Sequence, residues 1–215
     1  MIPAGGGDDP WTQLGEQFVD EHYGSLRGRV RTHVIHAHLL AHLPPPPARI
    51  VDVGGGAGTQ SIPLASLGYD VTIVDPSPSM LKRAQEQAEL AGVAYQVRLV
   101  EATGEHSPAA LNGEHFRAVL CHGVLMYLND PAPMIDALCA LAGRGAGISI
   151  VAKNIEAMAV RPALAGDWAA ALCAFDSDHQ INGLGVDTRG DDLETLSADL
   201  INRGVDRVVR RASVH

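Results

Sequence analysis

Three glycines and one acid form the part of this chain whose spacing could do chemistry. Gly54, Gly56 and Gly58 follow a short β-branched run, and Asp75 ends a second apolar run 21 positions after Gly54. This pattern predicts a strand, a tight glycine turn, a helix and a second parallel strand. Bare backbone at the turn would let a ligand approach closely, and Asp75 would be placed to accept hydrogen bonds from a ribose diol. We therefore expect a site for a ribose-containing cofactor.

Two classes of cofactor bind at such units, and the glycine spacing distinguishes them. Dinucleotide enzymes use G-x-G-x-x-G, because the pyrophosphate lies on the helix N-terminus. Here the spacing is G-x-G-x-G with Gly55 inside it, and Thr59 stands where the last glycine would fall. Together with Asp52 ahead of it, this shorter motif resembles motif I of class I S-adenosylmethionine (SAM) methyltransferases. The resemblance implies SAM as cofactor, with Asp52 near its methionine end. A nicotinamide dinucleotide remains the alternative.

The chain around this motif repeats the strand–helix alternation. Strands are predicted at 50–53, 71–74, 95–100, 116–121 and 148–152, with helices at 60–67, 80–91 and 134–141. This order predicts an α/β domain with a mostly parallel central sheet and helices on both faces, and the motif I resemblance implies the Rossmann-like class I methyltransferase fold. A helix at 190–202 and a candidate sixth strand at 205–209 follow. The long antiparallel strand that normally finishes this fold is missing, so we expect a C-terminal hairpin that is shortened or incomplete.

Composition shifts divide the chain into segments. Residues 1–10 are rich in glycine and proline, and we expect them to be disordered. Residues 11–47 read as a helical arm followed by a proline spacer, and residues 48–215 as the SAM-binding methyltransferase domain. Within that domain, residues 155–188 are expected to mix helix and loop and to form a lid over the substrate.

Charge and cysteine content limit the partners and the compartment. Sixteen basic side chains face 25 acids, for a formal net charge of −9, which argues against an extended nucleic-acid surface. The three cysteines lack metal spacing and no secretory signal precedes them, so we expect reduced thiols in a cytoplasmic protein. No apolar run approaches the roughly 18 residues of a membrane span. We expect no membrane partner.

Four histidines of the arm lie close together in the sequence, His33, His36, His38 and His42. Spacings of three and four would place pairs of them on one helix face, as in helical metal sites. The set lacks a matching acid or cysteine and continues round the helix. We therefore expect packing or solvated histidines and no bound metal.

The arm also carries Arg27, Arg29 and Arg31, either as a solvated helix start or as a source of one arginine folded over the glycine turn. The run EHYGSLRGRVR at 21–31 resembles the arm of the tRNA carboxymethoxyuridine methyltransferase group, and CHGVLMYLNDP at 121–131 resembles a second segment of that group. The resemblance covers about residues 12–154. It implies that Arg31 contacts SAM, where it would neutralise the methionine carboxylate.

The resemblance also implies an adenine site. The Asp-Pro-Ser segment that begins at Asp75 is similar to motif II, whose residues just past the acid, here Pro76, flank the adenine. The loop after the third strand would hold the adenine amine and ring nitrogens through Thr103 and Gly104, with Glu105 as a further candidate. An ordinary strand exit built of small residues is the alternative.

Acceptor-side residues are expected where the fourth and fifth strands end. His122 follows the fourth strand at the point where open α/β sheets bind ligands, and it matches a histidine of the carboxymethoxyuridine group; it could instead be a structural polar plug. His122 and Tyr127 are the nearest candidate bases for a hydroxyl or amine acceptor, whereas a carboxylate acceptor needs none. By analogy, Asn154 faces the substrate.

These observations lead to one principal hypothesis and one alternative. We expect a SAM-dependent methyltransferase whose acceptor is a small molecule, with a tRNA wobble-uridine carboxymethyl group as the other acceptor. The alternative is a SAM-binding protein without turnover, either regulatory or degenerate. An exposed sheet edge would also favour a homodimer.

Overall fold

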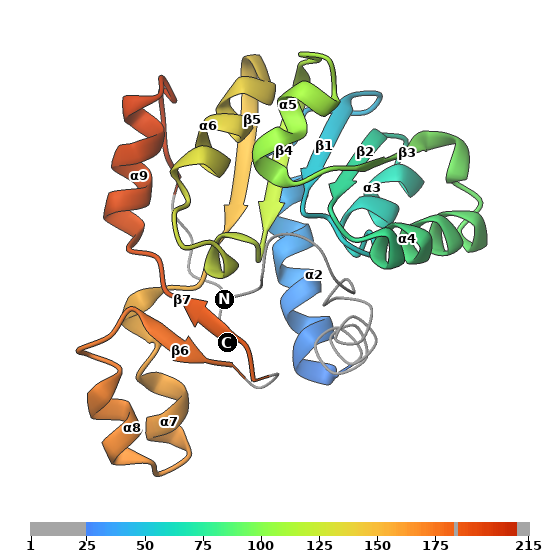
Figure 1. The fold of residues 1–215 in the computed structure, drawn as a ribbon. Helices are drawn as coiled ribbons and strands as arrows, with labels where there is room; N and C mark the ends of the chain where they lie inside the picture. Colours follow the sequence, from blue (N-terminus) through green and yellow to red (C-terminus); the bar gives the residue numbers. More distant parts are fainter. Residues whose placement is uncertain (1–24, 183–184, 210–215) are drawn as a thin grey trace.

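A computed structural model describes residues 25–182 and 185–209, and its centre is a five-stranded parallel sheet (Figure 1). The strands are β1 (Arg49–Val53), β2 (Asp70–Asp75), β3 (Val97–Glu101), β4 (Phe116–His122) and β5 (Ala142–Val151), in the order β3-β2-β1-β4-β5. Chain order reverses between β1 and β4, so the carboxyl ends of these two strands mark the ligand crevice of this type of sheet. The predicted disordered segment 1–10 and the first part of the arm lie outside the described residues.

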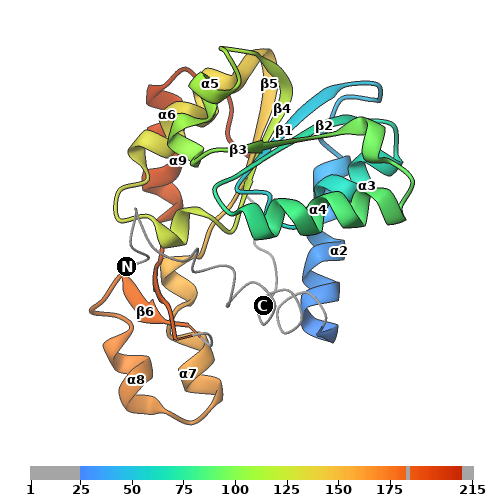
Figure 2. The ribbon, with the colours of Figure 1, turned by 45° about the vertical axis from the view of Figure 1, so that its right-hand side comes forward.

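Helices cover both faces of the sheet (Figure 2). On one face, α3 (Ser61–Ser66) and α4 (Pro78–Leu90) pack against Ile50 of β1. On the other face, α6 (Ala132–Leu141) packs against Val51, with α5 (Ser107–Ala110) and α9 (Leu193–Asn202) beside α6. Since neighbouring residues of β1 face opposite layers, Ile50, Val51 and Val53 are all buried, and the strand does not alternate between buried and exposed positions. The predicted fold class is confirmed.

The helix α2 (Leu26–Leu40) lies outside these layers, below the carboxyl ends of the strands in Figure 1. Ser25 caps it by accepting a hydrogen bond from the backbone N–H of Gly28 at 3.1 Å. Such a cap satisfies one of the N–H groups that the first turn of a helix leaves unpaired. The second helix expected in the arm is therefore present, and it stands next to the ligand crevice.

Between β5 and α9 the chain builds a separate lobe, residues 155–190. Its elements are η5 (Ile155–Ala157), α7 (Val160–Leu164), α8 (Trp168–Cys173), β6 (His179–Ile181) and β7 (Asp187–Arg189). The strands β6 and β7 form an antiparallel ribbon, so the expectation of only helix and loop in this segment was wrong. The lobe returns to the sheet where Asp191 pairs with Asn154, and the Asp191 N–H donates to the Lys153 carbonyl at 2.7 Å.

Several predicted boundaries shift for identifiable reasons. Strand β5 already begins at Ala142, because Ala142 and Gly147 pair with Phe116 and Ala118 of β4 across an irregular register. Helix α9 begins at Leu193 rather than at 190, since the Asp192 carboxylate caps it by accepting from the Thr195 N–H at 2.6 Å.

The predicted strand at 205–209 is not a strand. The Val205 N–H donates to the carbonyl of Leu200 and so completes the turn that follows α9. Within the described residues, β5 pairs only with β4, and no antiparallel strand joins the five-stranded sheet. No helix in the described ranges is long and apolar enough to cross a membrane.

Candidate active site

The glycine turn needs bare backbone for internal reasons as well as for a ligand. Gly54, Gly56 and Gly58 have φ values of 73°, 52° and 78°, in the left-handed region that favours glycine. A Cβ on Gly54 would lie 2.4 Å from Cγ2 of Val124, a severe overlap. A Cβ on Gly56 would project to within 3.9 Å of the Asp75 carboxylate. A Cβ on Gly56 would also lie 3.0 Å from Cε of Met80. Packing thus excludes a side chain at Gly54 and crowds one at Gly56, beside Asp75.

Asp75 ties the glycine turn to the segment after β2. Its Oδ2 accepts a hydrogen bond from the Gly56 N–H at 2.9 Å, and its Oδ1 accepts one from the Ser77 N–H at 3.0 Å. Each carboxylate oxygen has a second lone pair, so the buried carboxylate can also accept hydroxyl donors from a ribose. Exposed Pro76 follows directly. A carboxylate fixed by backbone beside bare Gly56 fits the ribose of an adenosyl cofactor.

Asp52 lies beneath the turn, with a side chain that is 3% exposed. Its Oδ2 accepts a hydrogen bond from the Ser61 hydroxyl at 2.7 Å, and a Cβ on Gly55 would lie 2.8 Å from the Asp52 carboxyl carbon. Burial raises the pKa of Asp52 to about 6, the Ser61 hydrogen bond opposes this, and the nearby Asp75 carboxylate adds to it. The carboxyl therefore braces the turn against the start of α3.

In the loop after β3, the small residue Gly104 is required for packing against α6. Gly104 begins a short turn, η3 (Gly104–His106), and a Cβ there would lie 2.1 Å from Cε of Met134 on α6. Thr103 is exposed, and its hydroxyl pairs with Nδ1 of His106 at 2.7 Å. Helix packing accounts for the glycine, so Thr103 and Glu105 are the side chains of this loop that remain for contact with an adenine.

His122 stands at the carboxyl end of β4, where the sequence placed it. Its Nε2 lies 2.9 Å from the hydroxyl of Ser149 on β5, and its buried Nδ1 has no hydrogen-bond partner among the described residues. Burial lowers the pKa of His122 to about 4, so the ring is neutral near pH 7. Tyr127 follows in the short turn η4 (Leu125–Tyr127) and is half-buried. Ser149 was not identified from the sequence.

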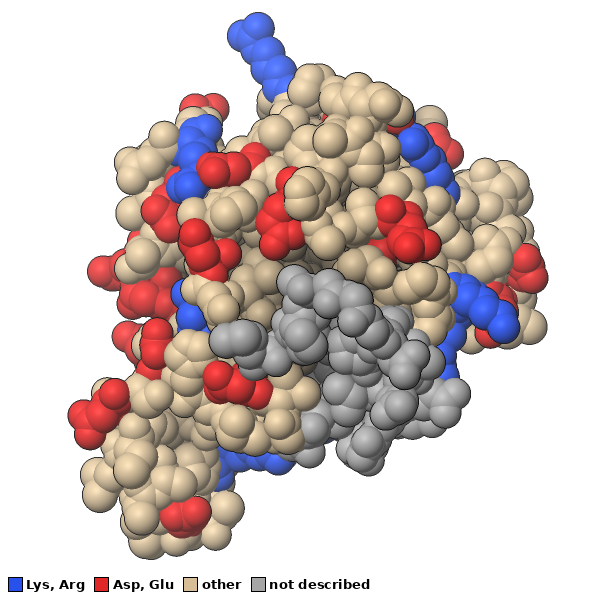
Figure 3. Space-filling view, in the orientation of Figure 1, with Lys and Arg blue, Asp and Glu red and all other residues tan. Residues whose placement is uncertain are grey.

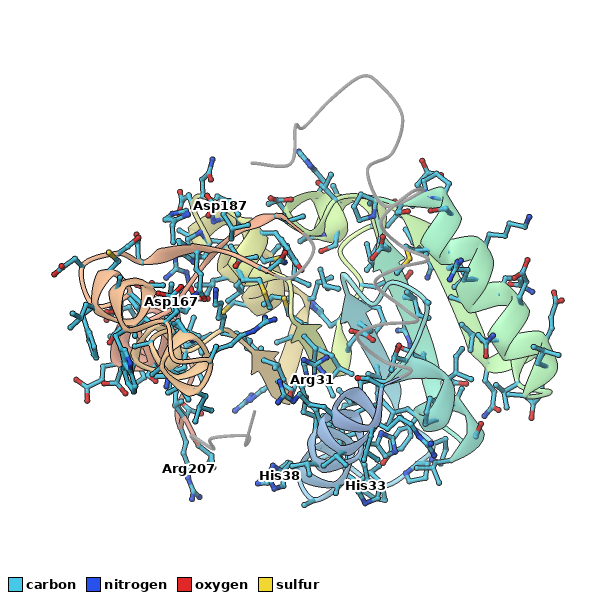
Figure 4. The ribbon with its side chains drawn as sticks, turned by 90° about the horizontal axis from the view of Figure 1, so that it is seen from below. Arg31, His33, His38, Asp167, Asp187 and Arg207 are labelled. Carbon is cyan, nitrogen blue, oxygen red and sulfur yellow. The ribbon has the colours of Figure 1, made fainter. Side chains whose placement is uncertain are left out.

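The arm docks beside the glycine turn through Gln60. The Gln60 side chain pairs with Nδ1 of His36 at 2.9 Å and donates to the Thr32 carbonyl at 3.3 Å. Figure 4 shows Arg31 on the side of α2 nearest the strands, with His33 and His38 farther from the sheet. Gln60 is a residue that sequence reasoning missed, because nothing local marks its contact with a helix 24 positions away.

The arm histidines do not converge. His36 pairs with Gln60, and Nδ1 of His42 lies 2.7 Å from the carbonyl oxygen of His38 on the same helix. In the part of the chain that the structure describes, no three His, Cys, Asp or Glu side chains lie close enough to hold a metal ion.

Residues at the end of β5 hold the lobe. The Asn154 side chain accepts a hydrogen bond from the Glu156 N–H at 3.0 Å and so caps η5. The Lys153 ammonium donates to the Thr188 hydroxyl at 3.0 Å and lies 3.4 Å from the Gln180 amide oxygen, which fixes the β6–β7 ribbon. Burial lowers the pKa of Lys153, and Asp187 partly offsets this. Asn154, expected to face substrate, makes its own contact within the lobe.

Comparison with known proteins identifies the part of the chain that carries this site. Residues 50–145 match the family described as methyltransferase domain. This part of the chain is similar to a methyltransferase domain. The expectations of a class I methyltransferase and of SAM as its cofactor are thereby confirmed, and the glycine turn, Asp75, the 103–105 loop and His122 all fall inside the matched residues.

Two curated relatives and one solved structure extend the comparison. The chain is 26% identical over 164 residues to tRNA 5-carboxymethoxyuridine methyltransferase of Escherichia coli, covering 75% of this chain and 62% of that protein. It is 33% identical over 131 residues to ubiquinone biosynthesis O-methyltransferase of Xanthomonas axonopodis, covering 60% and 53%. It thus spans less than two thirds of either relative. Magnesium protoporphyrin IX methyltransferase from Synechocystis, solved with bound SAH, has the same fold, with a TM-score of 0.64, 19% identity and coverage of 90% and 85%.

Proposed function

We propose that this chain transfers the methyl group of SAM to a small-molecule acceptor. The observation that carries the proposal is the Asp75 carboxylate, which two backbone N–H groups fix beside bare Gly56 at the carboxyl end of β2. SAM supplies a methyl group that is already activated as a sulfonium. The protein then has to hold the acceptor in line with that methyl group and exclude water.

Each proposed cofactor contact uses a residue that borders the crevice. Asp75 accepts from the ribose hydroxyls, while Arg31 on the strand-facing side of α2 neutralises the methionine carboxylate. Pro76 flanks the adenine, and Thr103 with the backbone of Gly104 contacts its edge. Asp52 contributes indirectly, since it braces the turn through Ser61.

His122 suits this site as a neutral hydrogen-bonding group. A protonated imidazole would repel the positive sulfonium, and burial keeps the ring uncharged near pH 7 by lowering its pKa to about 4. The same low pKa makes His122 a weak proton acceptor at that pH. The site therefore favours an acceptor that reacts without losing a proton, such as a carboxylate, and Asn154 with the lobe would border it.

A tRNA carboxymethyl acceptor is the second candidate, because the match to the Escherichia coli relative covers 75% of this chain. Arg27 and Arg29 are exposed on α2 and could meet phosphates. The net charge of −9 and the acidic side chains across the face in Figure 3 weigh against an extended phosphate contact. The family match does not favour a SAM-binding protein without turnover.

The proposal is tested by titrating SAM, its demethylated product and NADH calorimetrically into wild-type protein, Asp75→Ala and the control Asp70→Ala. Asp70 begins β2 and is exposed at the opposite end of the strand. We expect micromolar SAM binding that is lost in Asp75→Ala and retained in Asp70→Ala. A folded wild-type protein that binds no SAM would overturn the proposal. If that protein binds NADH, its cofactor is a nicotinamide dinucleotide. Radiolabelled methyl transfer to small carboxylates or to tRNA then separates the acceptors.

A further inference from the structure

The α7–α8 hairpin of the lobe exposes large apolar side chains that a monomer would be expected to cover. They are Val160 at 53%, Leu164 at 85%, Trp168 at 68%, Leu172 at 67% and Phe175 at 76% exposure. These five residues are called the α7–α8 face below. Over this lobe, Figure 3 shows mostly uncharged surface with several Asp and Glu side chains among it.

Helical spacing gathers these side chains. Val160 and Leu164 are one turn apart on α7, and Trp168, Leu172 and Phe175 follow at intervals of four and three along α8 and the turn after it. Such a stripe normally packs on the core of a protein. Here all five side chains are exposed, so they are available to a partner molecule.

We propose that the α7–α8 face binds the same face of a second copy of this chain. The five side chains expose on the order of 700 Å², close to the roughly 800 Å² that each partner contributes to a standard interface. Two of them are aromatic, the residue class that anchors interfaces. The exposed area is therefore of the size that a specific dimer needs.

Charge on the hairpin is self-complementary. Arg161 is the only basic residue between 160 and 176, and Asp167 and Asp176 lie at the two ends of α8. In a twofold pair, Arg161 meets Asp167 of the partner subunit if the hairpins run antiparallel, and Asp176 of the partner subunit if they run parallel. A membrane surface fits less well, because interfacial helices rely on several Lys and Arg side chains.

Sedimentation of the full chain over a range of concentrations tests the proposal. We expect a monomer–dimer equilibrium for the wild type, and at least a tenfold rise in the dimer dissociation constant for Leu172→Glu and Trp168→Glu. The controls are Leu90→Glu and Tyr95→Glu, whose side chains are 82% and 85% exposed on the far side of the domain. These controls should leave the equilibrium unchanged.

Charge variants refine the test. Arg161→Glu should weaken the dimer, and adding Asp176→Arg should restore it if the hairpins run parallel. Asp167 is left intact because its carboxylate caps α8 by accepting from the Ala170 N–H. Calorimetric SAM binding by Leu172→Glu confirms that the variant is folded. The proposal fails if the wild type stays monomeric, if Leu90→Glu acts like Leu172→Glu, or if the face binds phosphatidylcholine vesicles instead.

Discussion

The glycine turn and the α7–α8 hairpin use side chains in opposite ways. At the turn there is no room for a Cβ on Gly54, and the neighbouring carboxylates of Asp52 and Asp75 are held by specific donors. On the hairpin, Trp168 and Phe175 extend into solvent. Residues of the same chain supply the contacts that hold the turn, and a cofactor is what the turn would still bind. The hairpin leaves large apolar side chains exposed, as the proposed contact with a second copy requires. The two regions therefore differ in that one is crowded and the other is exposed.

Gly54→Ala should cause the largest loss of stability. It tests whether close packing is what requires a glycine in the turn. The new Cβ would overlap Val124 and strain a left-handed backbone, at a cost of about 3 kcal/mol or more in the free energy of unfolding. Gly145→Ala is the matched control, since Gly145 has a φ of 71° and nothing within 4 Å of a Cβ. It should lose only about 1–2 kcal/mol.

Urea unfolding measures both losses. Gly54→Ala combined with Val124→Ala should recover part of the stability, because the second change removes the overlapping carbon. Equal losses for Gly54→Ala and Gly145→Ala would show that backbone conformation alone accounts for the glycine.

Asp52→Asn should change how stability depends on pH. Burial raises the pKa of Asp52 to about 6 in the folded state, so its favourable contribution is complete below its unfolded pKa near 4 and is lost as pH rises through 6. Relative to Asp52→Asn, the wild type should therefore lose about 2–3 kcal/mol between pH 4 and 7. Thermal unfolding across this range measures the difference, and parallel profiles for the two proteins would contradict the raised pKa.

His122→Gln should shift the profile in the opposite direction. The folded-state pKa of His122 is lowered to about 4 from the ordinary 6.5, so its contribution is present above 6.5 and is lost as pH falls toward 4. Compared with His122→Gln, the wild type should gain stability as pH rises through this window. The same thermal series measures it, and a gain on acidification would rule out a neutral buried imidazole.

Lys153→Met should loosen the lobe and leave the sheet unchanged. The variant loses the donors that hold Thr188 and Gln180, and hydrogen exchange in β6 and β7 should become about tenfold faster. Lys82→Met is the control, because Lys82 is exposed on α4. Faster exchange in β1 and β4 as well would mean that lobe and sheet unfold together.

Gln60→Leu should have the smallest effect, a rise of about three- to tenfold in the SAM dissociation constant, because it releases α2 and with it Arg31. Gln85→Leu is the control, since the Gln85 amide donates to Glu89 along the exposed side of α4. Calorimetry measures the affinity. Unchanged SAM binding by Gln60→Leu would remove the arm from the cofactor site.

The sequence predicts those parts of the molecule that local sterics govern. The five parallel strands and the glycine turn follow from β-branched runs and positive φ angles, and the start of α4 follows from Ser77 and Pro78. The contacts of Gln60 and Asp191 could not be predicted, because each depends on a segment distant in the chain. Gly104 shows the opposite problem: its small size suggested ligand contact, whereas Met134 occupies the adjacent space. The site assignments for Arg31, Thr103 and Asn154 stay predictions.

The pairing of Asn154 with Asp191 has a consequence for how this molecule can be re-engineered. The two ends of the lobe meet at one point, and Gly190 is packed so closely there that a Cβ would lie 2.8 Å from the Ile155 Cα. A segment whose two ends are held together can change in length and sequence without displacing the sheet from which it extends. Residues 155–190 can therefore be exchanged as a unit: a different insert grafted between Asn154 and Asp191 should leave the five-stranded sheet and the glycine turn intact.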